Sequence, residues 1–388
     1  MTVGARDESP DESGISHFIE HMIFKGTARR SAFEIAKAFD VIGGQTNAFT
    51  AMETTCYHAR VMDAHLETMA DILCDVLRHS VFDPREVERE RPVIFQEIGM
   101  VEDSPEEHVH FLSENAYWGD HPLGRSVLGT RENVVRIDAA AIRDFFSRCY
   151  RPDRIVISAA GNLRHDRFLD LVAPAFQSIP ATPAPAPRIP PSPHPGVATH
   201  PRDLEQVHLC IEAPGLSITD PRRFSFSLLN TILGGNMSSR LFQEIRERQG
   251  LAYSVYSYLS TYVDVGLFGV YTAVDPGKAH EAARRILDEL RDLTETPVDP
   301  ETLADAKEYT KGCLFLAAES VDNQMVRLAQ NEIHFGRSFT LDEVVAQIEA
   351  VTPADILTLC QDLFLDDRMA ITLLGPVDGA DYPALLAS

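Results

Sequence analysis

One pattern of apolar and polar positions occurs twice along this chain. Residues 137–161 (IDAAAIRDFFSRCYRPDRIVISAAG) align without gaps with residues 351–375 (VTPADILTLCQDLFLDDRMAITLLG). Both copies indicate a capped amphipathic helix, then an Asp-Arg turn, then a short apolar run that ends at glycine. Such a run is typical of a buried strand. Each half is therefore predicted to end with a helix and then a strand, which indicates a duplicated α+β domain.

The stretch between the two copies separates the halves. Residues 180–195 are rich in proline, so we expect an extended, semi-rigid linker there. A chain of 388 residues also exceeds what one ordinary core accommodates. We predict two domains, residues 1–178 and residues 201–388, joined by a linker over residues 179–200.

The charge balance is strongly acidic, with 35 basic and 58 acidic side chains and a formal net charge of −23. This balance argues against nucleic acid or an anionic membrane as a partner. No apolar run approaches the roughly 20 residues of a membrane helix. The charge is compatible with a negative chamber that attracts basic peptides, and equally with a solvated acidic surface. Both interpretations stay open.

The segment His17-Phe18-Ile19-Glu20-His21 restricts the function most sharply. On a helix, residues three or four apart lie on one face. His17 and His21 can therefore present two imidazoles to one Zn²⁺, with Glu20 placed to take a proton from water. The order H-x-x-E-H is typical of a distinct class of zinc peptidases. Chance yields the pattern in roughly one chain in twenty-five of this composition, so a third ligand is required.

Candidates for the third ligand lie within residues 86–100 (EVERERPVIFQEIGM). Catalytic zinc usually takes three protein ligands and leaves one position for water. Pro92 can open a helix or lie in its first turn, which places Glu97 one to two turns further on. Glu90 lies close to the same face if the helix continues through Pro92. A solvated charged helix is the better explanation for most of these glutamates, and spacing alone does not single out Glu97.

Several segments together resemble the pitrilysin/insulinase family of zinc peptidases, which includes mitochondrial processing peptidase. The zinc helix matches over residues 13–27 (SGISHFIEHMIFKGT), and further signatures are residues 43–50 (GGQTNAFT), 121–125 (HPLGR) and 238–242 (SSRLF). The match extends over nearly the whole chain. It implies two homologous domains, each a mostly antiparallel sheet packed by helices and forming half of a clamshell.

The resemblance also assigns roles to individual residues. It implies that Glu97 is the third zinc ligand and that Glu90 is a carboxylate that supports the ligands. The counterpart of the zinc helix in the second half, residues 224–233 (FSFSLLNTIL), contains no histidine. One Zn²⁺ per chain is therefore expected.

The second half carries residues 246–253 (RERQGLAY), which resemble a substrate-binding Arg and Tyr pair of the family. A guanidinium and a phenol hydroxyl are suitable donors to a substrate carbonyl or a developing oxyanion. Without the resemblance, Arg246 would be an ordinary helix surface residue and Tyr253 an ordinary strand core residue. In two-part family enzymes this pair faces the zinc from the other half of the clamshell. A homodimer with each site closed by the partner chain is therefore expected, and a heterodimer with a metal-free sister chain is the alternative.

Four positions bear on substrate preference through the resemblance. Asn47 and Ala48 follow a Gly-Gly turn and imply an edge strand to which a peptide adds, with a plain paired strand as the alternative. Phe24 matches a position lining the pocket after the cleaved bond, or is simply core. Glu107 matches the first of two acids that read a presequence arginine, but Phe111 occupies the second position. Presequence-type specificity is therefore not expected.

The start of the chain and its cysteines bear on the compartment. The family normally begins some 25 residues earlier with strands, so we expect either a start assigned too late or a first sheet that lacks an edge. No signal peptide is recognisable at Met1, which favours the cytoplasm unless a lost leader carried a signal. Six cysteines without CxxC pairs are predicted to be reduced and mostly buried: Cys56, Cys74, Cys149, Cys210, Cys313 and Cys360.

These observations predict a zinc endopeptidase that hydrolyses unfolded peptides, or processes protein segments, inside a closed chamber. The alternatives are a zinc-bearing subunit of a heterodimer and a non-catalytic scaffold subunit. Scaffold members of the family usually lose zinc ligands. Because the ligand set is intact here, the enzyme is favoured over the scaffold.

Overall fold

The computed structural model describes residues 1–177, 179, 187–377 and 379–387. The chain forms two compact units: unit 1 comprises Met1–Val101, Arg125–Ile189 and Val321–Ile333, and unit 2 comprises Glu102–Gly124, Pro190–Ser320 and His334–Ser388. Each unit combines helices with a sheet, so the predicted two-domain α+β fold is confirmed. The units differ from the predicted sequential division, because residues 102–124 belong to unit 2 and residues 321–333 to unit 1.

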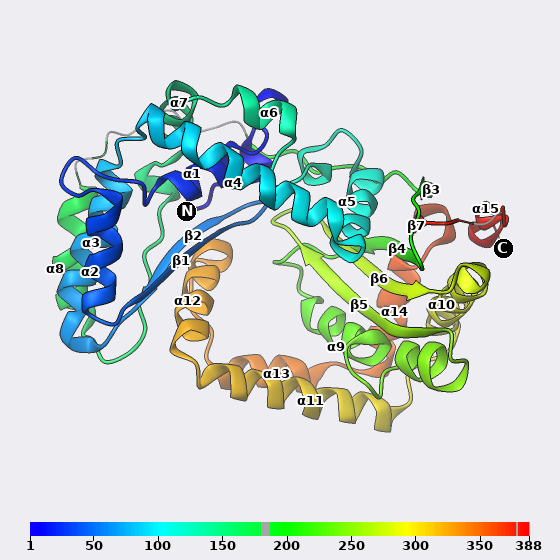
Figure 1. Cartoon of the computed structure of the whole chain (residues 1–388). Helices are drawn as coiled ribbons and strands as arrows, with labels where there is room; N and C mark the ends of the chain where they lie inside the picture. Colours follow the sequence, from blue (N-terminus) through cyan, green and yellow to red (C-terminus); the bar gives the residue numbers. More distant parts are fainter. Residues whose placement is uncertain (178, 180–186, 378, 388) are drawn as a thin grey trace. The chain divides into compact units, whose positions relative to one another are not determined.

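Unit 1 is built around a long antiparallel hairpin of β1 (Gln45–Thr50) and β2 (Thr55–Arg60), in which Thr50 lies opposite Thr55. Helices pack around it (Figure 1). They are α1 (Ile15–Met22), α2 (Ala32–Val41), α3 (Leu66–His79), α4 (Pro84–Asp103), α6 (Arg131–Arg136), α7 (Ala139–Cys149), α8 (His165–Phe176) and α12 (Val321–Phe335).

Unit 2 contains a five-stranded sheet with the order β3-β7-β4-β6-β5. The strands are β3 (Gly196–Pro201), β4 (Val207–Gly215), β5 (Ala252–Thr261), β6 (Gly266–Val274) and β7 (Ala370–Gly375). Every pairing is antiparallel except β3 with β7, as a mostly antiparallel sheet predicts. Strand β3 begins inside residues 179–200, the range assigned to the linker, and residues 180–186 of that range lie outside the described residues.

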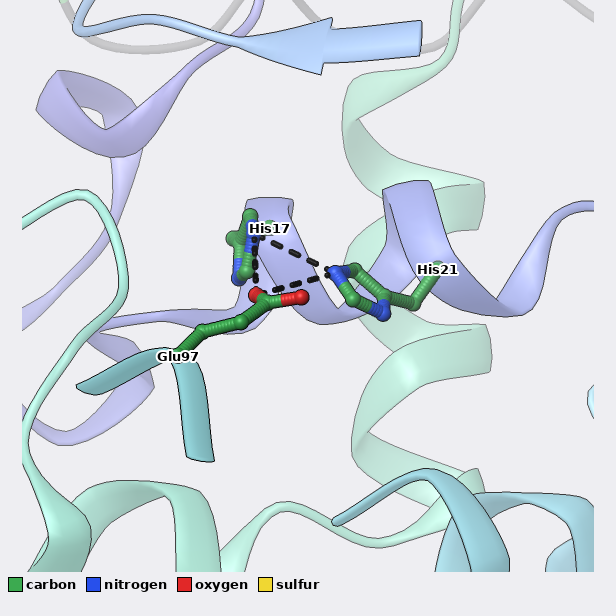
Figure 2. Close-up of side chains that lie close together, drawn as sticks. All are labelled: His17, His21 and Glu97. Atoms are coloured by element: carbon green, nitrogen blue, oxygen red, sulfur yellow. Dashed lines mark hydrogen bonds and ion pairs between the residues drawn. The ribbon is translucent and has the colours of Figure 1, made fainter. Parts of the chain in front are cut away.

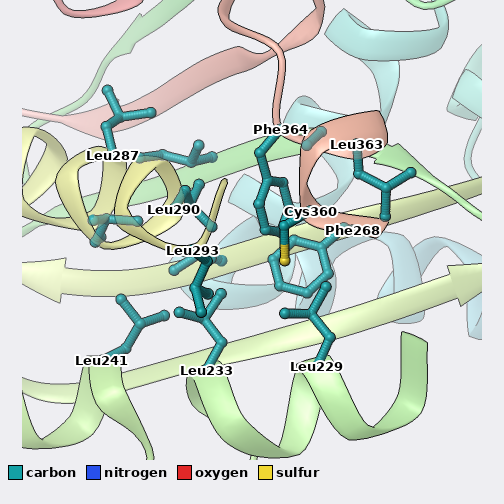
Figure 3. Packing of buried hydrophobic residues seen from close by; sticks show 14 of the residues in the cluster. Leu229, Leu233, Leu241, Phe268, Leu287, Leu290, Leu293, Cys360, Leu363 and Phe364 are labelled. Atoms are coloured by element: carbon teal, nitrogen blue, oxygen red, sulfur yellow. The ribbon is translucent and has the colours of Figure 1, made fainter. Parts of the chain in front are cut away.

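Helices cover both faces of this sheet. Neighbouring residues of a strand point to opposite sides, and apolar side chains are buried on each side. On one face, Leu209 belongs to a large core to which α9, α10 and α14 contribute (Figure 3). On the other face, Cys210 packs against Val109 of α5. The helices of the unit are α5 (Pro105–Trp118), α9 (Arg223–Gly234), α10 (Ala279–Glu295), α11 (Pro300–Ala318), α13 (Leu341–Ala350), α14 (Pro353–Leu363) and α15 (Tyr382–Leu386), with a π-helix at Phe242–Arg248.

The secondary structure predicted from the internal repeat is confirmed for both helices and for one of the two strands. Helix α7 and helix α14 occupy matching positions of the two copies, and a 3-10 helix follows each, Pro152–Arg154 and Asp366–Arg368. The apolar run of the second copy forms β7, whereas residues 155–160 of the first copy form no strand. Strand β7 lies between β3 and β4 and is paired on both sides. Among the described residues of unit 1, no strand pairs with residues 155–160.

A hollow of about 540 Å³ opens beside β2 within unit 1. Met1 and Thr55 exchange both backbone hydrogen bonds, at 2.9 and 3.1 Å, so the peptide groups of Thr55 point away from β1. By the alternation of an antiparallel pair, those of Tyr57 and Ala59 point the same way. In the part of the chain that the structure describes, no strand pairs with this edge beyond Met1. The apolar lining of the hollow includes Met69, Leu73, Leu77, Phe168, Val172, Met325, Val326 and Ile333.

All six cysteines are free thiols. Cys149, Cys210 and Cys360 are buried, and Cys313 is exposed. The structure therefore agrees with the expectation of free thiols, although half of them are not fully buried. Among the described residues, no helix has the length and apolar character that crossing a bilayer requires.

Candidate metal centre

The helix α1 presents the motif because its other face is buried. Phe18, Ile19 and Met22 belong to the core of unit 1. The helix begins after Gly14, whose φ of +93° favours glycine. A Cβ at this position would also lie 2.7 Å from the carbonyl oxygen of Leu128. The start of the motif helix is thus fixed by a residue that tolerates no side chain.

The helix α4 supplies the third group. It starts at Pro84 and runs through Pro92 to Asp103, so of the alternatives left open by the sequence the continuous helix is the one observed. The core residues Val87 and Ile94 anchor the segments on both sides of the proline. Because the helix is continuous, Glu90 and Glu97 are seven residues apart and lie on one face.

His17, His21 and Glu97 bring one ligand atom each to a common point, and their side chains converge from α1 and α4 (Figure 2). The two histidine Nε2 atoms are 3.3 Å apart, and Glu97 Oε2 lies 3.4 Å from His17 Nε2 and 3.3 Å from His21 Nε2. Tetrahedral zinc with bonds of about 2.0–2.1 Å separates its ligands by about 3.3–3.4 Å. The three measured edges therefore fit one Zn²⁺. No other group of this kind occurs among the described residues.

The protonation states suit metal binding. Burial, and then the nearby charge of His21, lower the pKa of His17 to about 3. His17 is therefore a neutral imidazole at neutral pH, the form in which histidine binds metals. Nε2 of His17 is the atom directed at the ligand triangle, and the buried Nδ1 has no hydrogen-bond partner in the described part of the chain.

Glu90 lies behind His21, as the resemblance implied. Its Oε1 is 3.0 Å from His21 Nδ1, and its Oε2 is 2.5 Å from Lys25 Nζ. Burial alone would raise the pKa of Glu90, but the hydrogen bonds from Lys25 and His21 outweigh burial and lower that pKa. A charged carboxylate at Nδ1 fixes the His21 tautomer so that Nε2 is free for a metal.

Glu20 is held by strand β1. The hydroxyl of Thr50 donates a 2.6 Å hydrogen bond to Glu20 Oε2. Burial raises the pKa of Glu20, and the Thr50 hydrogen bond opposes that shift. A carboxylate with a raised pKa is better suited to accept a proton and return it near neutral pH. The sequence alone did not point to Thr50.

Glu8 is the second residue that sequence reasoning missed. Its Oε2 accepts a hydrogen bond from the backbone N–H of Gly14, and its Oε1 accepts one from Ser16, both at 2.8 Å. Burial raises the pKa of Glu8 to about 8, and these two bonds act in the opposite direction. One weak signal was available: the helix-capping position is a glycine, which has no side chain to cap the helix itself.

The specificity positions of unit 1 lie on β1 and after α1. Asn47 is exposed and Ala48 is half-buried on β1, whose second edge is unpaired among the described strands. The half-buried ring of Phe24 packs edge-on against Tyr57, with centroids 6.2 Å apart. The position of Asn47 and Ala48 is compatible with peptide addition to β1, and that of Phe24 with the lining of a substrate pocket. Both roles remain predictions.

The predicted residues of unit 2 are described within that unit. The guanidinium of Arg246 lies 4.7 Å from the ring centroid of Tyr253, so the two form a stacked pair. Tyr253 is 81% exposed, which excludes the alternative that it is a strand core residue. Glu107 is exposed in the first turn of α5, beside the Ser104 cap.

Comparisons with known proteins define the class. A family model described as insulinase (peptidase family M16) matches residues 1–131, and one described as the peptidase M16 inactive domain matches residues 136–309. Together the two matches cover most of the chain. This chain therefore belongs to the insulinase family of zinc proteases, peptidase family M16.

Its curated relatives agree. An uncharacterized zinc protease of Streptomyces coelicolor is 41% identical over 97% of this chain and 83% of the relative. The uncharacterized zinc protease YmxG of Bacillus subtilis is 41% identical over 96% of this chain and 91% of the relative. An uncharacterized zinc protease of Rickettsia felis is 34% identical over 97% of this chain and 91% of the relative.

Solved structures share the fold. A protease from Helicobacter pylori has a TM-score of 0.89 at 21% identity, covering 97% of this chain and 92% of the other. A structure described as a peptidase M16 inactive domain from Pseudomonas fluorescens has a TM-score of 0.91 at 20% identity, covering 98% and 92%. Within this chain, the helix α9 contains residues 224–233, the predicted counterpart of the motif helix, and carries no histidine.

Proposed function

We propose that this chain is a zinc-dependent endopeptidase that hydrolyses unfolded peptides or processes extended protein segments. The observation that carries the proposal is the triangle of His17 Nε2, His21 Nε2 and Glu97 Oε2, whose edges of 3.3–3.4 Å match tetrahedral zinc. The zinc ion, when bound, supplies Lewis-acid polarisation of the scissile carbonyl and a more acidic water.

The remaining chemistry belongs to the chain. His17, His21 and Glu97 would hold the ion, and Glu90 would orient His21 through its Nδ1. Glu20 would take a proton from the attacking water and later return it to the leaving amine. The bond from Thr50 fixes the carboxylate that performs both transfers.

The free edge of β1 supports the choice of an extended substrate. A peptide that adds as a strand there would be held by backbone hydrogen bonds, which demand an unfolded segment but no particular sequence. A chamber closed around the peptide would account for the exclusion of folded proteins. The stacked Arg246 and Tyr253 are suitable donors to a substrate carbonyl.

The test is zinc content together with hydrolysis of an unstructured fluorogenic peptide, for the wild type and Glu20→Gln. We expect about one zinc per chain in both proteins and a loss of activity of at least a hundredfold in Glu20→Gln. Glu86→Gln is the matched control on the same helix, because its ion pair in the described part of the chain is with Arg89, whose side chain is 73% exposed. A wild type that binds no zinc would leave the scaffold alternative in place.

We further propose that the active form is a homodimer in which the Arg246/Tyr253 pair serves the zinc site of the partner chain. Mixing inactive Glu20→Gln with inactive Arg246→Ala tests this arrangement. Recovery of activity in the mixture is expected, because each variant supplies what the other lacks. No recovery, with a monomeric wild type that remains active, would contradict it. A wild type active only after addition of a metal-free sister chain would favour the heterodimer.

A further inference from the structure

We propose that Glu8 is a positioning residue that sets the helix α1 so that its histidines reach one zinc ion. This inference rests on the proposed function, since it concerns the same metal centre. Glu8 accepts hydrogen bonds from the backbone N–H groups of Gly14 and Ser16 at the start of the helix, and neither of these bonds involves a ligand side chain.

The need for such a residue follows from the length of α1. The helix has only eight residues, Ile15–Met22, so its first turn makes up nearly half of it. First-turn N–H groups have no partner within a helix. The capping residue Gly14 has no side chain, so it cannot accept a hydrogen bond from these N–H groups. The two oxygens of Glu8 accept the N–H groups of Gly14 and Ser16, the residue directly before His17.

Glu8 is itself fixed to the body of unit 1. Its carboxylate is buried, with only 5% of the residue exposed. Its carbonyl oxygen accepts a 3.2 Å hydrogen bond from Arg125. The two preceding residues form buried ion pairs, Arg6 with Glu53 at 2.7 Å and Asp7 with Arg154 at 2.8 Å. The helix start is therefore tied to a rigid point and not to a loose loop.

The predicted counterpart of this helix in unit 2 begins differently. In α9, the capping position is Arg222, and no side-chain cap bond is formed. The nearest carboxylate, Asp220, accepts the N–H of Arg222 from two residues away and forms an ion pair with the same side chain. A buried carboxylate anchored from six residues upstream is thus a feature of the helix that carries the histidines.

Glu8→Gln has a defined physical effect. The side chain keeps its shape, but its amide NH₂ replaces one acceptor and faces a backbone N–H. One helix amide loses its partner, and α1 can regain a partner only by shifting. Groups that orient metal ligands from outside typically change metal affinity by about 10–100-fold. We expect zinc binding to weaken by at least about tenfold, and Glu8→Asp, which keeps both carboxyl oxygens as acceptors, to retain more affinity than Glu8→Gln.

The experiment measures the zinc dissociation constant of the full chain by chelator competition, for the wild type, Glu8→Gln and Glu8→Asp. The matched control is Glu12→Gln, a carboxylate of the same segment that binds only Ser9 and a surface arginine. The visible spectrum of the Co²⁺-loaded proteins reports ligand geometry independently of activity. A weaker zinc affinity and a changed Co²⁺ spectrum, with Glu12→Gln unchanged, would support the proposal.

The opposite outcomes are equally clear. Wild-type zinc affinity and Co²⁺ spectrum in Glu8→Gln, with only a lower melting temperature, would show that Glu8 is a helix cap and nothing more. If Glu8→Gln does not fold, Glu8→Asp decides by the same two measurements. A wild type that binds no zinc overturns the proposed function itself, which separates that failure from a failure of the role of Glu8.

Discussion

The hydroxyl of Thr50 is the contact that ties Glu20 to the hairpin. We predict that Thr50→Val lowers kcat of the proposed peptidase by about tenfold to a hundredfold, because a hydrogen bond to a charged group contributes roughly 1.5–3 kcal/mol. Zinc content should stay at the wild-type level, since Thr50 contacts no ligand side chain. Steady-state kinetics with metal analysis checks both values.

Thr50→Ser is the control, because it keeps the hydroxyl and removes only a methyl group. It should retain most of the wild-type kcat. Equal losses in Thr50→Ser and Thr50→Val would mean that packing of the methyl group, and not the hydrogen bond, is what matters at this position.

Glu212 gives a prediction about stability. This carboxyl is fully buried under α5, its Oε2 has no partner among the described residues, and its Oε1 lies 3.4 Å from the Tyr258 hydroxyl. Burial, and then the charge of Glu114, raise the pKa of Glu212 well above its usual value. Above the pKa of an unfolded glutamate, the unfolded chain has lost this proton while the folded chain keeps it. The free energy of unfolding therefore falls as pH rises, by up to about 1.4 kcal/mol per pH unit from this group.

Glu212→Gln removes this titration and keeps the shape. We expect the stability of Glu212→Gln relative to the wild type to increase between pH 5 and pH 8 in denaturant titrations. A stability difference that is independent of pH would contradict the raised pKa of Glu212.

The metal residues divide into those that sequence could predict and those that it could not. The positions of His17 and His21 follow from helical spacing, which is local. Glu97 came from the family resemblance, because its contact depends on how α4 packs against α1. Thr50 and Glu8 were missed for the same physical reason: hydrogen bonds from β1 and from an irregular segment leave no periodic trace in the sequence.

At the scale of elements, the start of α1 is the most restricted turn. We predict that Gly14→Ala destabilises the protein by roughly 3 kcal/mol or more, because a left-handed backbone and a 2.7 Å contact act together. Gly43→Ala is the matched comparison, since Gly43 has a φ of +62° and open space around it. It should cost only about 1 kcal/mol. Denaturant titration of both variants measures the difference, and equal costs would show that the contact with Leu128 relaxes freely.

The elements that sequence predicted well are those with local causes. The helices α7 and α14 have capping residues and a periodic apolar face, and both were predicted within the repeat. Residues 155–160 share the apolar pattern of β7 but not its two neighbouring strands. A strand is completed by its partners, so identical patterns gave a strand in one unit and irregular chain in the other.

At the scale of the whole molecule, the net charge of −23 belongs to a chain that forms two compact units. The motif helix and its supporting carboxylates belong to unit 1, and the predicted donor pair belongs to unit 2. The sequence placed the motif helix and the predicted donor pair in different halves, but it did not predict that residues 102–124 belong to unit 2 and residues 321–333 to unit 1. Both segments contain helices, α5 and α12. A helical pattern in the sequence does not say which sheet the helix covers.

The apolar hollow beside β2 has a consequence for how the protein behaves in concentrated solution. Unpaired backbone groups next to apolar side chains favour strand-to-strand association between molecules, and like-charge repulsion opposes it. Salt at 1 M shortens the screening length to about 3 Å. We therefore predict that light scattering detects more association at high ionic strength, and less of it in Ile157→Lys, which places a cation on the exposed segment facing that edge. Scattering that is independent of salt would contradict this. The negative net charge thus keeps molecules of this protein apart through electrostatic repulsion. Crystallisation or storage buffers with low salt should therefore keep the protein monodisperse.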